Sequence, residues 1–174
     1  MGQSATSLPA SAPERDHICE PGRNCWCIAR AARMAVLVDA DAYFGAFAAA
    51  VARAQESIFV IGWDIQAATR LLPGPMPYGR PNTLREYLNA TLTARPGLNA
   101  YLLDWDFSLV FALEREVLPV LQLGWLSHPR LHFSLDGEHP LTGCHHQKIV
   151  VVDDAVAFVG GLDLTTSRWD TPAA

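Results

Sequence analysis

Short runs of β-branched and aromatic residues alternate along this chain with longer stretches that carry apolar residues at helical spacing. The runs are too short for helices and are typical of buried strands, at 35–38, 57–62, 98–103 and 131–134. The stretches between them predict helices at 42–55, 83–94 and 109–123, the last interrupted near Pro119. Strands that alternate with helices of this length predict an α/β fold, with a central mixed or parallel β-sheet flanked by helices.

Turn-forming residues set the expected limits of these elements. Thr83 is a suitable N-cap for the second helix, and Gly97 is expected to close that helix. The segment 71–81 contains four prolines and two glycines, so we expect an irregular loop there.

The first 33 residues differ in character and are expected to be a loose N-terminal segment ahead of one folded domain at 34–174. They lack the apolar stretch of a secretory signal, and their opening fits only the loose myristoylation pattern, which many chains match by chance. Cys19, Cys25 and Cys27 have the spacing of neither a zinc ribbon nor a clear disulfide framework, so we interpret them as reduced thiols. No apolar stretch approaches the ~20 residues that span a bilayer, which predicts a cytoplasmic protein without a membrane anchor.

The segment 145–163 contains the residues best suited to chemistry. It predicts a strand, a tight turn at Asp153, a second strand and a glycine pair. Because side chains alternate along a strand, His146 and Lys148 are expected on one face, where an imidazole and an ammonium lie side by side. This pair suits a phosphate, since the imidazole can attack phosphorus or carry a proton while the lysine neutralises the non-bridging oxygens.

The other polar residues of this segment are expected to support the pair. Asp153 has the opposite parity to the lysine five residues before it, which places it at the turn with a structural role. The strand 149–152 is apolar on both faces, so it should be central and should hold the histidine rigidly. Gly160 and Gly161 allow a close backbone approach, and Asp163 is interpreted either as a turn-stabilising carboxylate or as a contact of the active site.

Two other interpretations of these residues are less favourable. A lysine without a partner on an apolar strand is costly to bury, so a purely structural role for His146 and Lys148 is disfavoured. His139, Cys144 and His145 do not have the spacing of a known metal site, and we expect no metal or other cofactor.

The motif resembles that of a known family. His146, Lys148 and Asp153 fit the pattern HxKxxxxD, followed by a glycine pair, that marks the phospholipase D superfamily. The surrounding sequence, including 157–164 and the Arg168-Trp169-Asp170 stretch, is similar to the first motif of the phosphatidylcholine-cleaving branch. The resemblance extends more weakly to roughly Arg23 to Asp170 and identifies the chain as the N-terminal half of such an enzyme, with the first motif only.

The resemblance implies a mechanism and a set of roles. One motif histidine attacks phosphorus to give a phosphohistidine, the other protonates the leaving alcohol, and water or a second alcohol resolves the intermediate. By this resemblance His146 is the nucleophile or its acid–base partner, Lys148 binds phosphate and Asp153 stabilises the fold. Gly160, Gly161 and Asp163 are candidates for binding the substrate. The implied substrate is a phospholipid, which is compatible with a peripheral position at a membrane surface.

The family uses two such motifs that face one another, and this chain contains one. One imidazole cannot both attack phosphorus and protonate the leaving group on the opposite side. We therefore expect either a truncated chain, which we favour and whose missing C-terminal half carries the second motif, or a homodimer that completes the site.

Other functions remain as alternatives at this point. They are a cardiolipin synthase-like transferase, a dimeric phospholipase D-family nuclease and an inactive fragment that only binds a partner. The formal net charge of −5 gives little support to nucleic-acid binding, so we expect no nucleic-acid partner.

Overall fold

The structure is a computed structural model that describes residues 18–106, 123–124, 126–140, 143–166 and 168–171. The chain divides into two units, Met1–Val36 and Leu37–Ala174. The described part of the first unit has a tight turn in which the Gly22 N–H donates to the Cys25 carbonyl at 2.8 Å. The second unit contains the sheet, both α-helices and all the candidate site residues.

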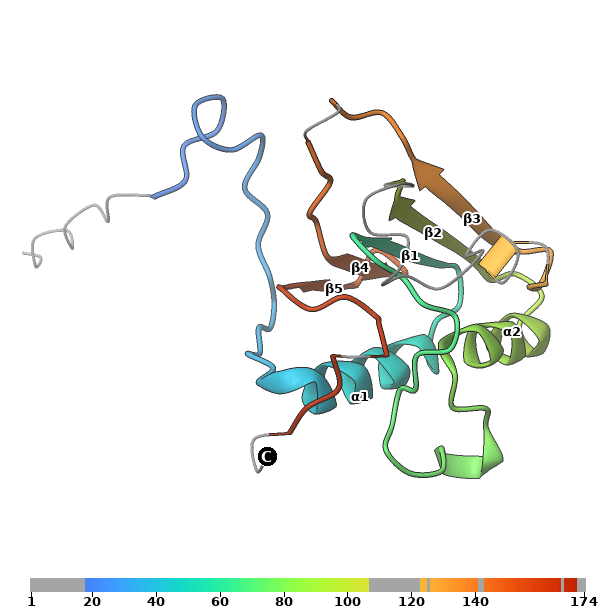
Figure 1. Ribbon diagram of the computed structural model, residues 1–174. Helices are drawn as coiled ribbons and strands as arrows, with labels where there is room; N and C mark the ends of the chain where they lie inside the picture. Colours follow the sequence, from blue (N-terminus) through green and yellow to red (C-terminus); the bar gives the residue numbers. More distant parts are fainter. Residues whose placement is uncertain (1–17, 107–122, 125, 141–142, 167, 172–174) are drawn as a thin grey trace, which may run out of the picture. The chain divides into compact units, whose positions relative to one another are not determined.

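A five-stranded mixed sheet forms the centre of the second unit, with strand order β3-β2-β1-β4-β5 (Figure 1). The strands are β1 (Ser57–Gly62), β2 (Asn99–Trp105), β3 (Leu131–Asp136), β4 (Ile149–Val152) and β5 (Val156–Val159). The pairs β1–β2 and β2–β3 are parallel, whereas β1–β4 and β4–β5 are antiparallel. This arrangement confirms the predicted α/β fold with a mixed sheet.

Two helices pack on one face of this sheet, α1 (Asp39–Val51) and α2 (Leu84–Ala94), and both lie along the same side in Figure 1. Each helix buries an apolar stripe, which includes Phe44 and Phe47 of α1 and Leu88 of α2. The stripes share one core with alternate strand residues such as Val60 and Val150. Each fully buried side chain of this kind contributes about 1.5–3 kcal/mol, so this layer fixes the sheet that carries the site.

The opposite face of the sheet is only half-buried. Phe59 and Tyr101 are 39% and 40% exposed, and their rings stack with centroids 4.9 Å apart. Within the described residues, no helix covers this face. The strand 149–152 does lie between two neighbours, as predicted, but it is not buried equally on both sides, since Val150 and Val152 are buried while Ile149 and Val151 are half-buried.

Several predicted element limits were wrong. No strand forms at 35–38, where Val36 and Val38 are 81% and 59% exposed, because an apolar run becomes a strand only when it has a partner to pair with. The first helix begins at Asp39 rather than 42 and ends at Val51 rather than 55. After Val51 the N–H groups of Arg53 and Ala54 donate to carbonyls three residues back, and those of Gln55 and Glu56 donate to a distant carboxylate.

The second helix was predicted well except at its end. Thr83 is the N-cap residue, although its hydroxyl donates to the Glu86 carboxylate at 2.7 Å rather than capping the backbone. Arg95, not Gly97, is the C-cap, and the guanidinium of Arg130 donates to the carbonyls of Leu92 and Arg95 at this helix end. The helix predicted at 109–123 lies outside the described residues except for Leu123.

Candidate functional site

The candidate residues gather at one edge of the sheet because of the strand directions. The parallel strands β1, β2 and β3 all end at this edge. The antiparallel strand β4 begins here, with Ile149 opposite Ile61, and β5 ends here, with Val159 opposite Ile149. Segments that leave the carboxyl ends of parallel strands are where open α/β sheets bind their ligands.

Lys148 and Asp163 form a buried ion pair at this edge. The Lys148 Nζ lies 3.1 Å from the Asp163 Oδ2, and the two residues are 8% and 4% exposed. The second carboxylate oxygen, Oδ1, accepts a hydrogen bond of 2.9 Å from the Trp63 N–H. The pair places the Lys148 ammonium beside the indole of Trp63.

The approach of Asp163 to the end of β1 depends on Gly62. A Cβ added at Gly62 would lie 3.2 Å from the Asp163 Oδ1 and 2.8 Å from a side-chain carbon of Ile65. Only glycine leaves room for the carboxylate to reach the next backbone N–H.

His146 lies against the same indole. The ring centroids of His146 and Trp63 are 6.2 Å apart in an edge-to-face arrangement, and the Lys148 Nζ lies 5.8 Å from the Trp63 centroid. The His146 residue is exposed whereas Lys148 is buried. A phosphate placed over this indole can therefore meet an accessible imidazole and an oriented positive charge.

The alternation argument for this pair was wrong, because β4 begins at Ile149 and both residues precede it. The last residue pair between β1 and β4 is Ile61 with Ile149. Just beyond it, the backbone N–H of Trp63 donates to the Asp163 carboxylate and not to the chain that precedes β4. The two side chains meet at Trp63 rather than on a shared strand face.

The glycine pair borders open space. Among the described residues, apart from the chain neighbours of each glycine, no atom lies within 4 Å of a Cβ added at Gly160 or Gly161. The Gly160 N–H donates to the Lys148 carbonyl at 3.3 Å, which links the end of β5 to the start of β4. Packing within the described residues does not require either glycine.

Asp153 lies at the opposite edge of the sheet, in the turn between β4 and β5, where Asp153 and Asp154 have φ values of 52° and 49°. It lies five positions after Lys148, which in an extended chain corresponds to about 16 Å. Its carboxylate accepts hydrogen bonds from the N–H groups of Gln55, Glu56 and Ser57, at 2.8, 2.8 and 2.9 Å. The described contacts of this carboxylate are therefore with the backbone that leads into β1.

Asp153→Ala is expected to lower the free energy of unfolding by about 2 to 3 kcal/mol more than Asp154→Ala, because it leaves three N–H groups without their acceptor. Asp154 is the matched control, since it is exposed and has the same backbone conformation. Urea denaturation of both variants measures the difference, and equal losses would contradict an anchoring role.

The same carboxylate predicts a pH dependence. Burial alone would raise the pKa of Asp153, but the N–H groups of Ser57, Glu56 and Gln55, with the charge of Arg95, outweigh it and hold the pKa below its ordinary 3.8. A lowered folded-state pKa stabilises the fold above the unfolded value, and that stabilisation is lost as the pH falls through the folded value. The difference in the free energy of unfolding between the wild type and Asp153→Ala should therefore become smaller as the pH falls below 3.8. Urea denaturation at a series of pH values measures this difference.

Gln66 is a residue of this edge that the sequence did not indicate. Its N–H donates to the Leu164 carbonyl at 3.0 Å, and its Oε1 accepts bonds from the Thr166 N–H and hydroxyl at 3.0 and 2.8 Å. Its Nε2 donates to the Asp64 carboxylate at 3.0 Å. Gln66 thus ties the segment after β1 to the segment after Asp163, and no motif spacing signals such a contact across 100 residues.

Within the described residues, no group of three or more His, Cys, Asp or Glu side chains is arranged to hold a metal ion. Among the helices of that same part, none combines the length and apolar character needed to cross a bilayer.

The chain is similar to several curated proteins, although no family model matches it. It is 30% identical to phospholipase D2 of Bos taurus over 176 residues, which cover 97% of this chain and 18% of that protein. It is 32% identical to phospholipase D zeta 1 of Arabidopsis thaliana over 142 residues, 77% of this chain and 12% of the relative. Phospholipase D B of Dictyostelium discoideum is 29% identical over 145 residues, 77% of this chain and 11% of the relative. The chain thus spans less than a fifth of the length of these relatives.

Proposed function

This chain belongs to the phospholipase D superfamily, and we propose that it supplies one half of an active site that cleaves a phospholipid phosphodiester. The observation that carries the proposal is the meeting of an exposed His146 and a buried, carboxylate-held Lys148 on one indole, at the edge where the parallel strands end. The reaction would yield a phosphatidyl group bound to the protein and a free head-group alcohol.

In the first step, a ring nitrogen of His146 attacks phosphorus and forms a P–N bond. The P–O bond to the head group breaks, and the departing oxygen takes a proton from a second histidine. In the second step, water or an alcohol attacks phosphorus, its proton passes to the second histidine, and the P–N bond breaks to release the product and His146.

Lys148 would stabilise the charge that builds on the non-bridging oxygens during both steps. Preorganised charges are effective because they need no reorganisation when the reaction occurs, and Asp163 holds this ammonium at 3.1 Å. The exposed Gly160 and Gly161 would let the substrate approach the backbone beside Lys148. Asp153 would act only by holding β4 in place from the far edge.

The second histidine must come from another motif-bearing half. The chain contains one HxKxxxxD sequence, and attack and protonation occur on opposite sides of phosphorus in an in-line displacement. We propose that this half is either a further part of a longer polypeptide or a second copy of the chain, and that the assembled site works at a membrane surface.

The proposal is tested by incubating the full chain with phosphatidylcholine vesicles over a wide range of protein concentrations, with and without ethanol, and in parallel with DNA. The expected products are choline and phosphatidate, partly replaced by phosphatidylethanol when ethanol is the acceptor. If two copies form the site, the specific activity should rise with protein concentration. Release of phosphocholine would place cleavage on the wrong side of phosphorus, and preferential cleavage of DNA would favour a nuclease; either would contradict the proposal.

A further inference from the structure

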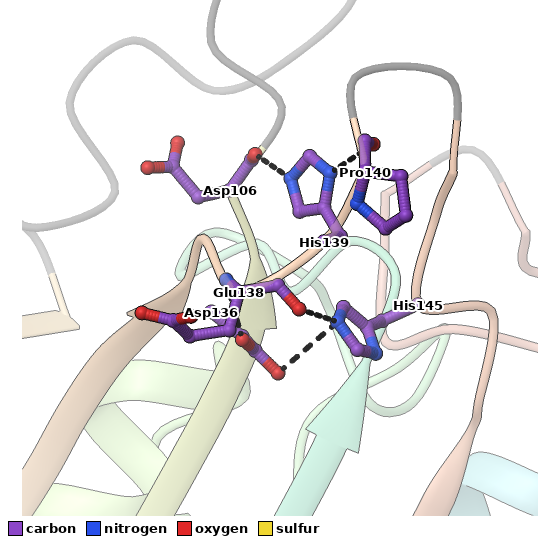
Figure 2. A network of polar contacts seen from close by, with 6 residues as sticks. All are labelled: Asp106, Asp136, Glu138, His139, Pro140 and His145. Carbon is purple, nitrogen blue, oxygen red and sulfur yellow. Dashed lines mark hydrogen bonds and ion pairs between the residues drawn. The ribbon is translucent and has the colours of Figure 1, made fainter.

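The loop that delivers His146 to the site is fastened to a neighbouring strand by a histidine. We call the described residues between β3 and β4, 137–140 and 143–147, the β3–β4 loop. It begins at a turn in which the Glu138 N–H donates to the Asp136 Oδ1 at 3.1 Å. His139 follows, and its side chain points across to the end of β2 rather than into solvent (Figure 2).

Both ring nitrogens of His139 face backbone carbonyl oxygens. Nδ1 lies 2.9 Å from the Pro140 oxygen, and Nε2 lies 2.9 Å from the Asp106 oxygen just beyond β2. Carbonyl oxygens only accept, so both contacts are hydrogen bonds only when both nitrogens carry a proton, as in the imidazolium. A neutral ring would turn one lone pair toward an oxygen.

The surroundings of the ring also favour the charged form. The Pro140 carbonyl contributes most to raising the pKa of His139 above its ordinary 6.5 and the Asp106 carbonyl is next; desolvation opposes them, and the Asp136 and Asp106 carboxylates add to them. The indole of Trp105 lies against the ring, with centroids 5.4 Å apart.

His145 is a further titratable group that faces this ring. Its own ring lies 6.0 Å from that of His139, and its Nε2 is 3.2 Å from the Glu138 carbonyl and 3.6 Å from the Asp136 carboxylate. Figure 2 shows the two histidines as separate contacts of the same loop, one to the end of β2 and one to the end of β3.

We propose that His139 is a positioning residue for this site: its protonated ring clasps the β3–β4 loop to the end of β2 and thereby sets where His146 is held. His146 follows the clasp by seven residues and is fixed on its other side by the bond between Gly160 and the Lys148 carbonyl. Loss of the proton removes one of the two hydrogen bonds and leaves a ring-nitrogen lone pair facing a carbonyl oxygen, which weakens the clasp. The catalytic consequence rests on the proposed function, but the clasp itself does not.

The pH dependence of the clasp has a definite sign. A histidine whose folded-state pKa is raised stabilises the folded arrangement fully below its unfolded pKa, and this stabilisation is lost as the pH rises through the folded value. The clasp is therefore strongest below the ordinary pKa of 6.5, and it weakens as the pH rises through the raised folded-state pKa of His139.

The test is an NMR titration of the full chain, following the histidine rings and the backbone amides between pH 5 and 9. We expect the His139 ring to titrate above pH 6.5, and the amides of Gly143 and His146 to shift with the same midpoint. The Gly143 amide is a sensitive reporter because it donates to the same Pro140 oxygen, at 2.9 Å. His139→Gln should abolish this transition in both amides.

Two variants separate the clasp from its surroundings. His145→Gln tests whether the neighbouring ring causes the transition. His132→Gln is a control for the removal of any histidine, because His132 is an exposed residue of β3. Both variants should keep the transition. A His139 midpoint at or below 6.5, or amide transitions that persist in His139→Gln, would overturn the proposal.

Activity distinguishes the clasp from the function it serves. In phosphatidylcholine cleavage, His139→Gln should lower kcat about tenfold at neutral pH, which is the expected effect of losing one charged hydrogen bond. KM should change less. The fall in activity on the alkaline side of the pH profile should become shallower. Unaltered kcat and pH profile in an active His139→Gln protein would refute the positioning role. The NMR transition without any phosphodiesterase activity would instead refute a site formed by two copies of this chain and leave the clasp intact.

Discussion

His146→Gln is expected to lower the rate of phosphatidylcholine cleavage by the assembled enzyme by roughly 10⁴-fold or more, the range in which positioned nucleophiles and acid–base groups act. Glutamine can still form hydrogen bonds in this position but cannot form a P–N bond. Because His146 is exposed, the free energy of unfolding should change by no more than about 0.5 kcal/mol. Steady-state kinetics together with urea denaturation separate these two effects.

His132→Gln is the matched control for this substitution. His132 is also exposed, but it lies on β3 with its ring stacked on Tyr101 at 4.8 Å, away from the site edge residues. Its activity should equal that of the wild type. A His146→Gln protein that retains more than about a tenth of wild-type turnover would exclude His146 as nucleophile, since a tenfold loss is smaller than the effect of removing a positioned acid–base group.

Asp163→Ala is expected to lower the free energy of unfolding by about 3 to 5 kcal/mol, the usual cost of leaving one member of a buried ion pair alone. The substitution leaves the Lys148 ammonium buried without its partner at 3.1 Å, and it also removes the acceptor of the Trp63 N–H. Equilibrium urea denaturation at neutral pH measures the loss.

A second substitution tests the cause. Replacing Lys148 by Met in the Asp163→Ala background removes the stranded charge and keeps much of the side-chain volume, so stability should partly return. If Asp163→Ala costs less than about 1 kcal/mol, Lys148 reaches solvent in the folded protein and is not held as the proposed mechanism requires.

The fold was predictable wherever local pattern and tertiary pairing agree. The run 57–62 became β1 with the predicted bounds because it pairs on both sides, with β2 and β4. The run 35–38 has a similar composition but forms no strand. Strand formation depends on a neighbouring strand to pair with more than on the β-propensity of the residues. Gln55, which was predicted to be helical, donates its N–H to Asp153, about a hundred residues away, and no local pattern contains such a contact.

The site was predictable as a set of residue types but not as a geometry. The motif identified His146, Lys148 and Asp163, and the structure brings these side chains together through Trp63. Strand alternation gave the wrong reason for their proximity, since the strand starts too late. The clasp by His139 was not predictable. The spacing of His139, Cys144 and His145 could be compared with known metal sites, but it does not indicate contacts with backbone carbonyls of a neighbouring strand.

The turn that holds Asp153 gives the spacing of the motif a physical meaning. The four residues between Lys148 and Asp153 are the four residues of β4. The motif therefore spans the length of this strand, from the edge with the candidate site to the edge where Asp153 binds the backbone. Adding or removing one residue would either move the carboxylate off its three N–H donors or turn every β4 side chain to the other face. The fixed count in HxKxxxxD is therefore a length requirement, and chemistry alone would not impose it.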